Sequence, residues 1–220
     1  MELRIDLETG RTACAESAES FVAAIDGLDE RELLDASRCH GWTRLDVVVH
    51  VIHGWYEMLG GLVSPVDGPP TVDAASYWPA FADQFGSDDP IPALMSQRRR
   101  TAAYARPASA VAELHDVGAA IGRGIAACAD RPLLWQGHVF AAGDYLAVWA
   151  VEQVVHQLDL DTDHPVPASA LGVTRATVEA LLGEPLPTRL DDVGAVLVGT
   201  GRAAPPADLG PLAQRLPVIR

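Results

Sequence analysis

The chain has 220 residues, of which 49% are apolar, and its 30 acidic and 16 basic side chains give a formal net charge of −14. This length suits one domain of moderate size with an appendage, and such a core forms without disulfides or a structural metal. The negative charge argues against nucleic acid or an anionic membrane as a partner, because their phosphates would be repelled.

The first residues, the hydropathy of the chain and its cysteines predict where in the cell the protein is located. Residues 1–6 are too polar for a signal peptide, and no apolar run reaches the ~18 residues that a membrane span requires. Cys14, Cys39 and Cys128 are odd in number, far apart and outside any CxxC pair. We therefore expect free thiols in a reducing environment and predict a cytoplasmic protein.

Helical periodicity dominates the chain. The predicted helices span residues 12–28, 43–59, 77–85, 93–104, 108–129, 144–160 and 174–182, with Gly60 and Gly61 ending the second. The proline-rich residues 63–92 predict a long crossover around the short third helix, and residues 133–143 an irregular loop or short hairpin.

Four long helices with one long crossover are typical of an all-α four-helix bundle. We place this bundle in residues 1–165 and a short C-terminal extension, ambiguous between helix and minor β-structure at its end, in residues 166–220.

The second helix carries a polar stripe on an apolar background. Asp46, His50, His53 and Glu57 fall at i, i+4, i+7 and i+11, on one face. Thr43 predicts an N-cap, and Asp46, three residues on, completes a capping box. His53 is either a catalytic acid or base or merely a neighbour of His50.

The helix over residues 144–160 repeats this pattern with Glu152, His156 and Asp159. Glu152 and His156 lie one turn apart, which is the spacing of two ligands of one metal. A histidine from a facing helix would complete a His/Glu/His set with an open fourth position, as in catalytic zinc sites. Spacing alone equally allows a solvated face and a satisfied core histidine.

Two segments carry a family resemblance: residues 41–50 read GWTRLDVVVH and residues 152–160 read EQVVHQLDL. At these residues the chain resembles the mycothiol-dependent maleylpyruvate isomerase family, within the DinB-like (YfiT-like) superfamily of metal-binding four-helix bundles. The resemblance implies that His50, Glu152 and His156 bind a divalent metal. We expect zinc, and the sequence leaves nickel, manganese and iron open. It also implies mycothiol as the thiol cosubstrate.

Such a centre would activate a thiol for isomerisation of a small electrophile or for S-transfer to it. Asp159, one turn beyond His156, is a candidate outer partner for a ligand imidazole, or an exposed carboxylate near the helix end. From the run of three arginines at 98–100 we select Arg98 as a candidate for binding a substrate carboxylate, against a solvated basic face.

Three hypotheses follow. The first is a zinc-dependent enzyme whose partners are a low-molecular-weight thiol and a small-molecule substrate, acting as a monomer or homodimer. The second is a non-catalytic metal-binding or ligand-binding bundle of the DinB-like type. The third is a metal-free helical protein whose polar stripes face water.

Overall fold

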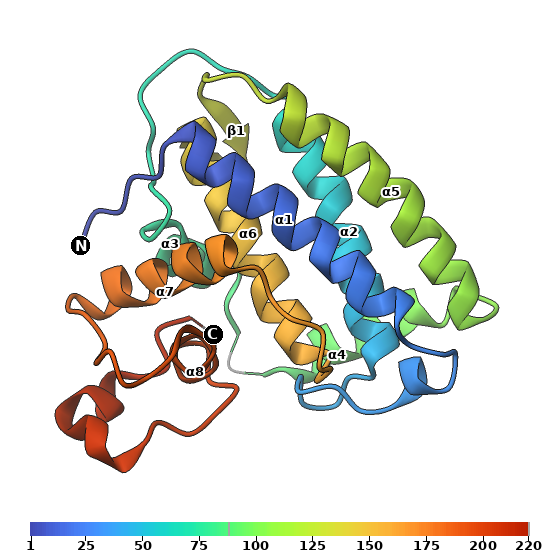
Figure 1. Ribbon diagram of the computed structural model, residues 1–220. Coiled ribbons are helices and arrows are strands. Elements are labelled where there is room, and N and C mark those ends of the chain that lie inside the picture. The colour runs from blue at the N-terminus through green and yellow to red at the C-terminus, as the bar shows by residue number, and fades with distance from the viewer. Residues whose placement is uncertain (88, 220) are drawn as a thin grey trace.

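A computed structural model describes residues 1–87 and 89–219, so the last residue of the predicted extension lies outside the described part. It is mostly helical, which confirms the all-α bundle prediction (Figure 1). The helices are α1 (Leu7–Asp26), α2 (Arg44–Leu62), α3 (Tyr77–Phe85), α4 (Ile91–Thr101), α5 (Pro107–Ala127), α6 (Ala142–Asp159), α7 (Ala168–Leu182) and α8 (Asp192–Gly199). Two 3₁₀ segments, Glu32–Leu34 and Ala207–Arg215, and one hairpin complete the described elements. In that part of the chain no helix is long and apolar enough to cross a membrane.

The four long helices α1, α2, α5 and α6 form the bundle (Figure 1). Helix α1 packs along α6 and α5, and α2 packs along α5 and α6. Helix α6 is the central element, because only Glu152 and Leu158 in it escape full burial. Phe21 of α1 meets Trp55 of α2 edge-on, with ring centroids 6.1 Å apart. The polar stripe of α6 is therefore set in a packed core, with Glu152 only partly buried.

The start of α2 confirms the predicted capping box. The Thr43 backbone N–H donates to Asp46 Oδ2 at 2.8 Å, and the Asp46 N–H donates to Thr43 Oγ1 at 3.1 Å. The hydroxyl of Thr101, from α4, also donates to Asp46 Oδ1 at 2.6 Å. Asp46 therefore closes a helix end and ties α4 to α2.

The end of α2 differs from the prediction. The helix continues through Gly60 and Gly61 to Leu62. A Cβ on Gly61 would lie 2.2 Å from the Tyr145 hydroxyl oxygen, which donates to the Met58 carbonyl at 2.7 Å. Gly61 therefore allows α2 to pack closely against α6, and it does not end the helix.

The end of α6 is fastened to the segment that leads into α2. The Arg38 backbone N–H donates to the Asp159 carbonyl at 2.8 Å. The Arg44 guanidinium donates to the carbonyls of Leu160, at 2.6 Å, and Asp161, at 3.2 Å. These donors satisfy carbonyls that a helix C-terminus leaves without intrahelical partners, and their positive charge complements the helix dipole.

The structure decides between the two predictions for residues 133–143. Strands β1 (Leu133–Trp135) and β2 (His138–Phe140) form an antiparallel hairpin. Gln136 and Gly137, with φ of 48° and 78°, make its two-residue turn, as primed hairpin turns require. The Thr71 N–H donates to the Val139 carbonyl at 2.8 Å and so holds the long crossover against the hairpin.

The elements described in the C-terminal extension are all helical, with irregular segments between them. Helix α7 begins at Ala168 instead of 174, because Pro167 stands at its N-cap and the whole segment packs on α1 and α6. Gly183, at φ 83°, ends α7 in the left-handed conformation that glycine favours. Helix α8 and the 3₁₀ segment Ala207–Arg215 follow, and neither is a strand.

Candidate metal centre

His50 of α2 and Glu152 and His156 of α6 come together where the two helices face each other. One ligand atom from each lies within 4.8 Å of the others. His156 Nε2 is 3.2 Å from Glu152 Oε2, and the two imidazole centroids are 4.6 Å apart. The two polar stripes therefore face each other, which spacing alone did not establish. Two nitrogens and one carboxylate oxygen at this separation fit a divalent ion with an open position.

Burial sets the charge state of His50. It lowers the pKa of His50 to about 3, and the nearby charge of His156 acts in the same direction. The imidazole is therefore neutral at physiological pH, which is the form that binds a metal. Burial acts to raise the pKa of Glu152, but the hydrogen bond and charge of His156 outweigh it and leave that pKa below its ordinary value. The carboxylate is thus ionised.

The second nitrogen of His156 is held by Asp159. Nδ1 lies 3.0 Å from Asp159 Oδ2, and the Asp159 side chain is fully buried. An ionised carboxylate only accepts, so Nδ1–H donates and the Nε2 edge is directed at Glu152. Asp159 thus contacts the second ring nitrogen of His156, as a carboxylate that orients a metal-binding histidine does, and it is not the exposed carboxylate of the alternative prediction. Burial acts to lower the pKa of His156, but its hydrogen bonds, that to Asp159 foremost, raise it well above its ordinary value.

Two further residues form hydrogen bonds with the Asp159 carboxylate. The Cys39 thiol donates to Asp159 Oδ2 at 3.0 Å, and Arg202 donates to both carboxylate oxygens at 3.1 Å. Neither was predicted as a site residue, because Cys39 comes from the loop before α2 and Arg202 from the segment after α8. Neither lies on a periodic stripe, and no signal in the sequence connects them to α6.

A cavity of about 320 Å³ adjoins the ligand set, and His50 and Glu152 both line it. Its other walls are aromatic and polar side chains from α2, α3, α4, α6 and the hairpin. The aromatic members are Tyr77, Phe81, Phe85, Trp135 and Trp149, and the polar members are His53, Glu57, Arg100 and Gln136. Such a space takes a small molecule against the open side of the ligand set.

His53 lines this cavity, one helical turn from His50. Its Nδ1 lies 2.8 Å from the Val49 carbonyl. A carbonyl accepts, so the Nδ1–H donates to it and Nε2 is the ring nitrogen that remains for another partner.

The structure does not place Arg98 at the cavity. Its guanidinium is exposed and donates to the Gly41 carbonyl at 2.8 Å. Arg100 lines the cavity instead. Successive residues of a helix point about 100° apart, so two positions turn the side chain to another face. The run of arginines thus contains a cavity residue, but not the one selected from the sequence.

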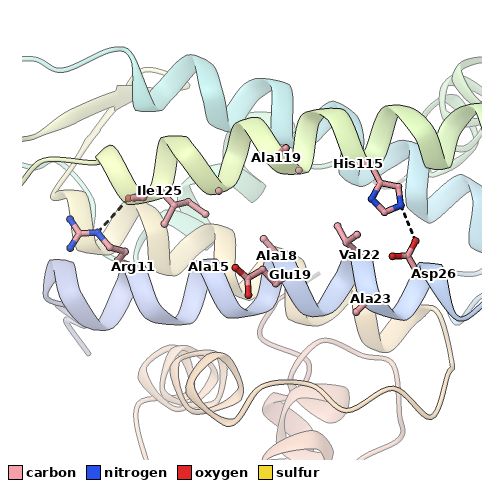
Figure 2. Close-up of a pocket in the computed structure, with 13 residues that line it drawn as sticks. Arg11, Ala15, Ala18, Glu19, Val22, Ala23, Asp26, His115, Ala119 and Ile125 are labelled. Carbon is pink, nitrogen blue, oxygen red and sulfur yellow. Dashed lines mark hydrogen bonds and ion pairs between the residues drawn. The ribbon is translucent and has the colours of Figure 1, made fainter.

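A larger groove, of about 680 Å³, runs between α1 and α5 (Figure 2). Small apolar side chains such as Ala15 and Ala119 line it, and the pair of His115 and Asp26, 2.8 Å apart, marks one end. None of the three ligand residues lines this groove, so the centre and the groove are separate features.

The fold and the site together define a helical bundle in which two histidines and a glutamate, residue types that could hold a metal ion, come together beside an aromatic cavity. The sequence family described as the mycothiol maleylpyruvate isomerase N-terminal domain matches residues 14–161, about two thirds of the chain. The chain therefore belongs to the mycothiol maleylpyruvate isomerase family.

Two solved structures resemble the chain. One, a histidine-to-alanine mutant of the mycothiol-dependent maleylpyruvate isomerase, shares 13% identity over 90% of both chains with a TM-score of 0.62. The other, a structure of the mycothiol-dependent maleylpyruvate isomerase, shares 15% identity over 81% of this chain and 70% of its own, with a TM-score of 0.57. At these identities the likeness shows the fold. No curated protein matches the sequence.

Proposed function

We propose that the protein is a zinc-dependent enzyme that activates mycothiol, or a similar low-molecular-weight thiol. The thiol would either catalyse isomerisation of a small electrophile or be joined to it through sulfur with expulsion of a leaving group. The observation that carries the proposal is the convergence of His50, Glu152 and His156, within 4.8 Å, at the edge of a cavity. Membership of the mycothiol maleylpyruvate isomerase family supports the choice of thiol.

The ligand residues suit this chemistry. Two neutral imidazoles and one carboxylate would leave a bound zinc ion with a net charge of +1, and zinc lowers the pKa of a thiol that reaches its open position. Asp159 keeps the His156 ring turned so that Nε2 faces the other two ligands. Trp149 and Trp135 line the cavity beside Glu152 and would give the reacting groups an apolar wall.

Different residues of the cavity would accept the thiol proton and bind the substrate. His53 would take the thiol proton on Nε2 and return it later, since its Nδ1–H is held by Val49. Arg100 would hold a substrate carboxylate bidentately from the cavity wall, a role that the sequence had suggested for Arg98. The proposed substrate is thus a small electrophile that carries a carboxylate.

The first experiment measures bound metal. Protein expressed with supplementary zinc should carry close to one zinc ion per chain, and His50→Ala and His156→Ala should each lose it. His115→Ala is the matched control, because His115 pairs with Asp26 between α1 and α5, outside the ligand set. Wild-type protein without metal would reject the proposal in favour of the metal-free hypothesis.

The second experiment measures turnover with mycothiol and a panel of carboxylate-bearing electrophiles. Consumption of an electrophile that depends on both thiol and zinc supports the enzyme. Zinc binding without turnover across the panel would instead support the non-catalytic bundle.

A further inference from the structure

His156 belongs to two candidate ligand sets, one on each side of its ring. On the Nε2 side stand His50 and Glu152, and on the Nδ1 side stand Cys39 and Asp159. The ligand atoms of Cys39, His156 and Asp159 also lie within 4.8 Å of one another. Thiolate, imidazole and carboxylate are all ligands that zinc accepts. The geometry therefore offers an ion two positions beside one histidine.

The two positions differ in what they adjoin. His50 and Glu152 line the 320 Å³ cavity, whereas neither Cys39 nor Asp159 does. An ion on the Nδ1 side would sit away from the cavity and from His53. Only the Nε2 position serves the proposed chemistry. The proposed centre therefore requires a residue that favours binding of the ion on the Nε2 side over binding on the Nδ1 side.

Arg202 stands at the second position. Its Nε and Nη2 each donate to an oxygen of Asp159 at 3.1 Å, and Nη2 also lies 3.9 Å from Cys39 Sγ. Its Nη1 donates to the Thr200 carbonyl at 2.9 Å, which fixes the plane of the guanidinium. Arginine keeps its positive charge at any physiological pH. A cation that belongs to the chain is therefore placed against the oxygens and the sulfur that a metal would need.

The backbone holds Arg202 in this position. The Arg202 N–H donates to the Leu197 carbonyl at 2.7 Å, and Gly201, at φ 73°, makes the turn that follows α8. The N–H groups of Val218 and Ile219 donate to the Gly199 carbonyl, so the end of the chain braces the same turn. Asp159 is fully buried, and the paired guanidinium compensates its charge.

We infer that Arg202 is a positioning residue that selects the Nε2 side of His156 for the metal, because its guanidinium fills the cation position between Cys39 and Asp159. This inference rests on the proposed metal centre. It gives the C-terminal extension a defined part in that centre, since removal of the guanidinium would open a competing Cys/His/Asp site away from the cavity.

The test uses cobalt in place of zinc, because a thiolate ligand gives cobalt an intense near-ultraviolet charge-transfer band. Cobalt-loaded wild type should lack this band. Arg202→Gln, which removes the guanidinium and its charge but keeps a polar side chain, should show it, and Arg202→Gln combined with Cys39→Ser should lose it again. Arg189→Gln is the matched control, because Arg189 pairs with Asp208 in the same extension but both side chains are more than half exposed.

The outcomes distinguish a failure of the role inferred for Arg202 from a failure of the proposed metal centre. A thiolate band in wild type, or no band in folded Arg202→Gln with unchanged zinc affinity, would overturn the role of Arg202. Should Arg202→Gln not fold, Cys39→Ser alone decides: unchanged zinc affinity supports the inference, and a loss of about tenfold or more overturns it. Wild type that takes up neither cobalt nor zinc would remove the proposed metal centre.

Discussion

His156 and Asp159 are joined by a hydrogen bond of 3.0 Å between Nδ1 and Oδ2, and this bond determines which edge of the imidazole faces Glu152. The donor and its acceptor lie three residues apart on α6, so the helix itself brings them together.

Replacement of Asp159 should weaken metal binding without touching a ligand. In Asp159→Asn the acceptor for Nδ1–H is weakened and the ring orientation is no longer held, so we expect zinc affinity to fall about 10–100-fold. Competition with a chromophoric chelator measures the affinity. Asp161→Asn is the control, because Asp161 is exposed and pairs with Arg38 at the surface. Equal affinity in wild type and Asp159→Asn would contradict the orienting role.

Zinc uptake should release a proton near neutral pH. The pKa of His156 is raised well above its ordinary 6.5, so the metal-free ring holds a proton that the ion must displace from Nε2. Apparent affinity should therefore rise with pH, by up to about tenfold per unit, until the pKa of His156 is passed. Calorimetry in buffers of different ionisation enthalpy counts the protons. Uptake with no proton released would show that the ring is already neutral.

His50→Leu should not destabilise the metal-free protein, and should stabilise it in acid. Burial lowers the pKa of His50 to about 3 in the folded protein. Below about pH 6.5 the His50 imidazole therefore binds a proton in the unfolded state but not in the folded state, and acid favours unfolding. Leucine removes this penalty, which amounts to about 2 kcal/mol at pH 5 and vanishes above pH 7. Chemical denaturation at pH 5 and 7.5 compares the two proteins. A large loss of stability at pH 7.5 would mean that the imidazole makes contacts a leucine cannot replace.

Arg100→Gln should impair substrate binding more than catalysis. Loss of a charged hydrogen bond to a carboxylate costs about 1.5–3 kcal/mol, so KM for an anionic electrophile should rise about 10–100-fold with kcat little changed. Steady-state kinetics on an active thiol–electrophile pair measures both constants. Arg98→Gln serves as the control, since that side chain contacts the Gly41 carbonyl at the surface. A larger rise in KM for Arg98→Gln than for Arg100→Gln would indicate that Arg98 binds the substrate carboxylate.

The two adjacent glycines of α2 should respond oppositely to alanine. In Gly61→Ala the new Cβ would lie 2.2 Å from the buried Tyr145 hydroxyl, and such overpacking costs about 1–3 kcal/mol. In Gly60→Ala nothing lies within 4 Å of the new Cβ, so the better helix former should stabilise the protein by about 0.5–1 kcal/mol. Thermal denaturation of both variants tests the contrast. Equal effects would mean that α2 and α6 are not packed as closely as described.

The sequence predicted the existence of the long helices, because apolar periodicity records which face of each helix is buried. It placed the start of α1 at residue 12, whereas the helix begins at Leu7 behind the N-cap Asp6. The capping box of Thr43 and Asp46 is likewise a local signal and was found. The end of α2 was misplaced because Gly61 makes room for the side chain of Tyr145, which is distant in sequence. The start of α7 was misplaced because its burial against α1 and α6 extends the helix beyond its local pattern.

The site was only partly accessible from the sequence. Helical spacing placed His50, Glu152 and His156 on two stripes, and the resemblance joined them, but only the fold brings the stripes within 4.8 Å. Arg100 could not be chosen over Arg98, since the choice depends on the rotation of α4 about its axis. Cys39 and Arg202 reach Asp159 from loops, which carry no periodic signal. The division at residue 165, the cytoplasmic location and the monomeric or dimeric state stay predictions.

The fastening of the end of α6 by Arg38 and Arg44 has a kinetic consequence. Arg44 is the first residue of α2, so the two helices that carry the proposed ligands are held in axial register at one end. An incoming ion then meets side chains that need only rotamer adjustment, without a sliding step between helices. Metal capture should accordingly proceed in a single phase whose rate is proportional to ion concentration.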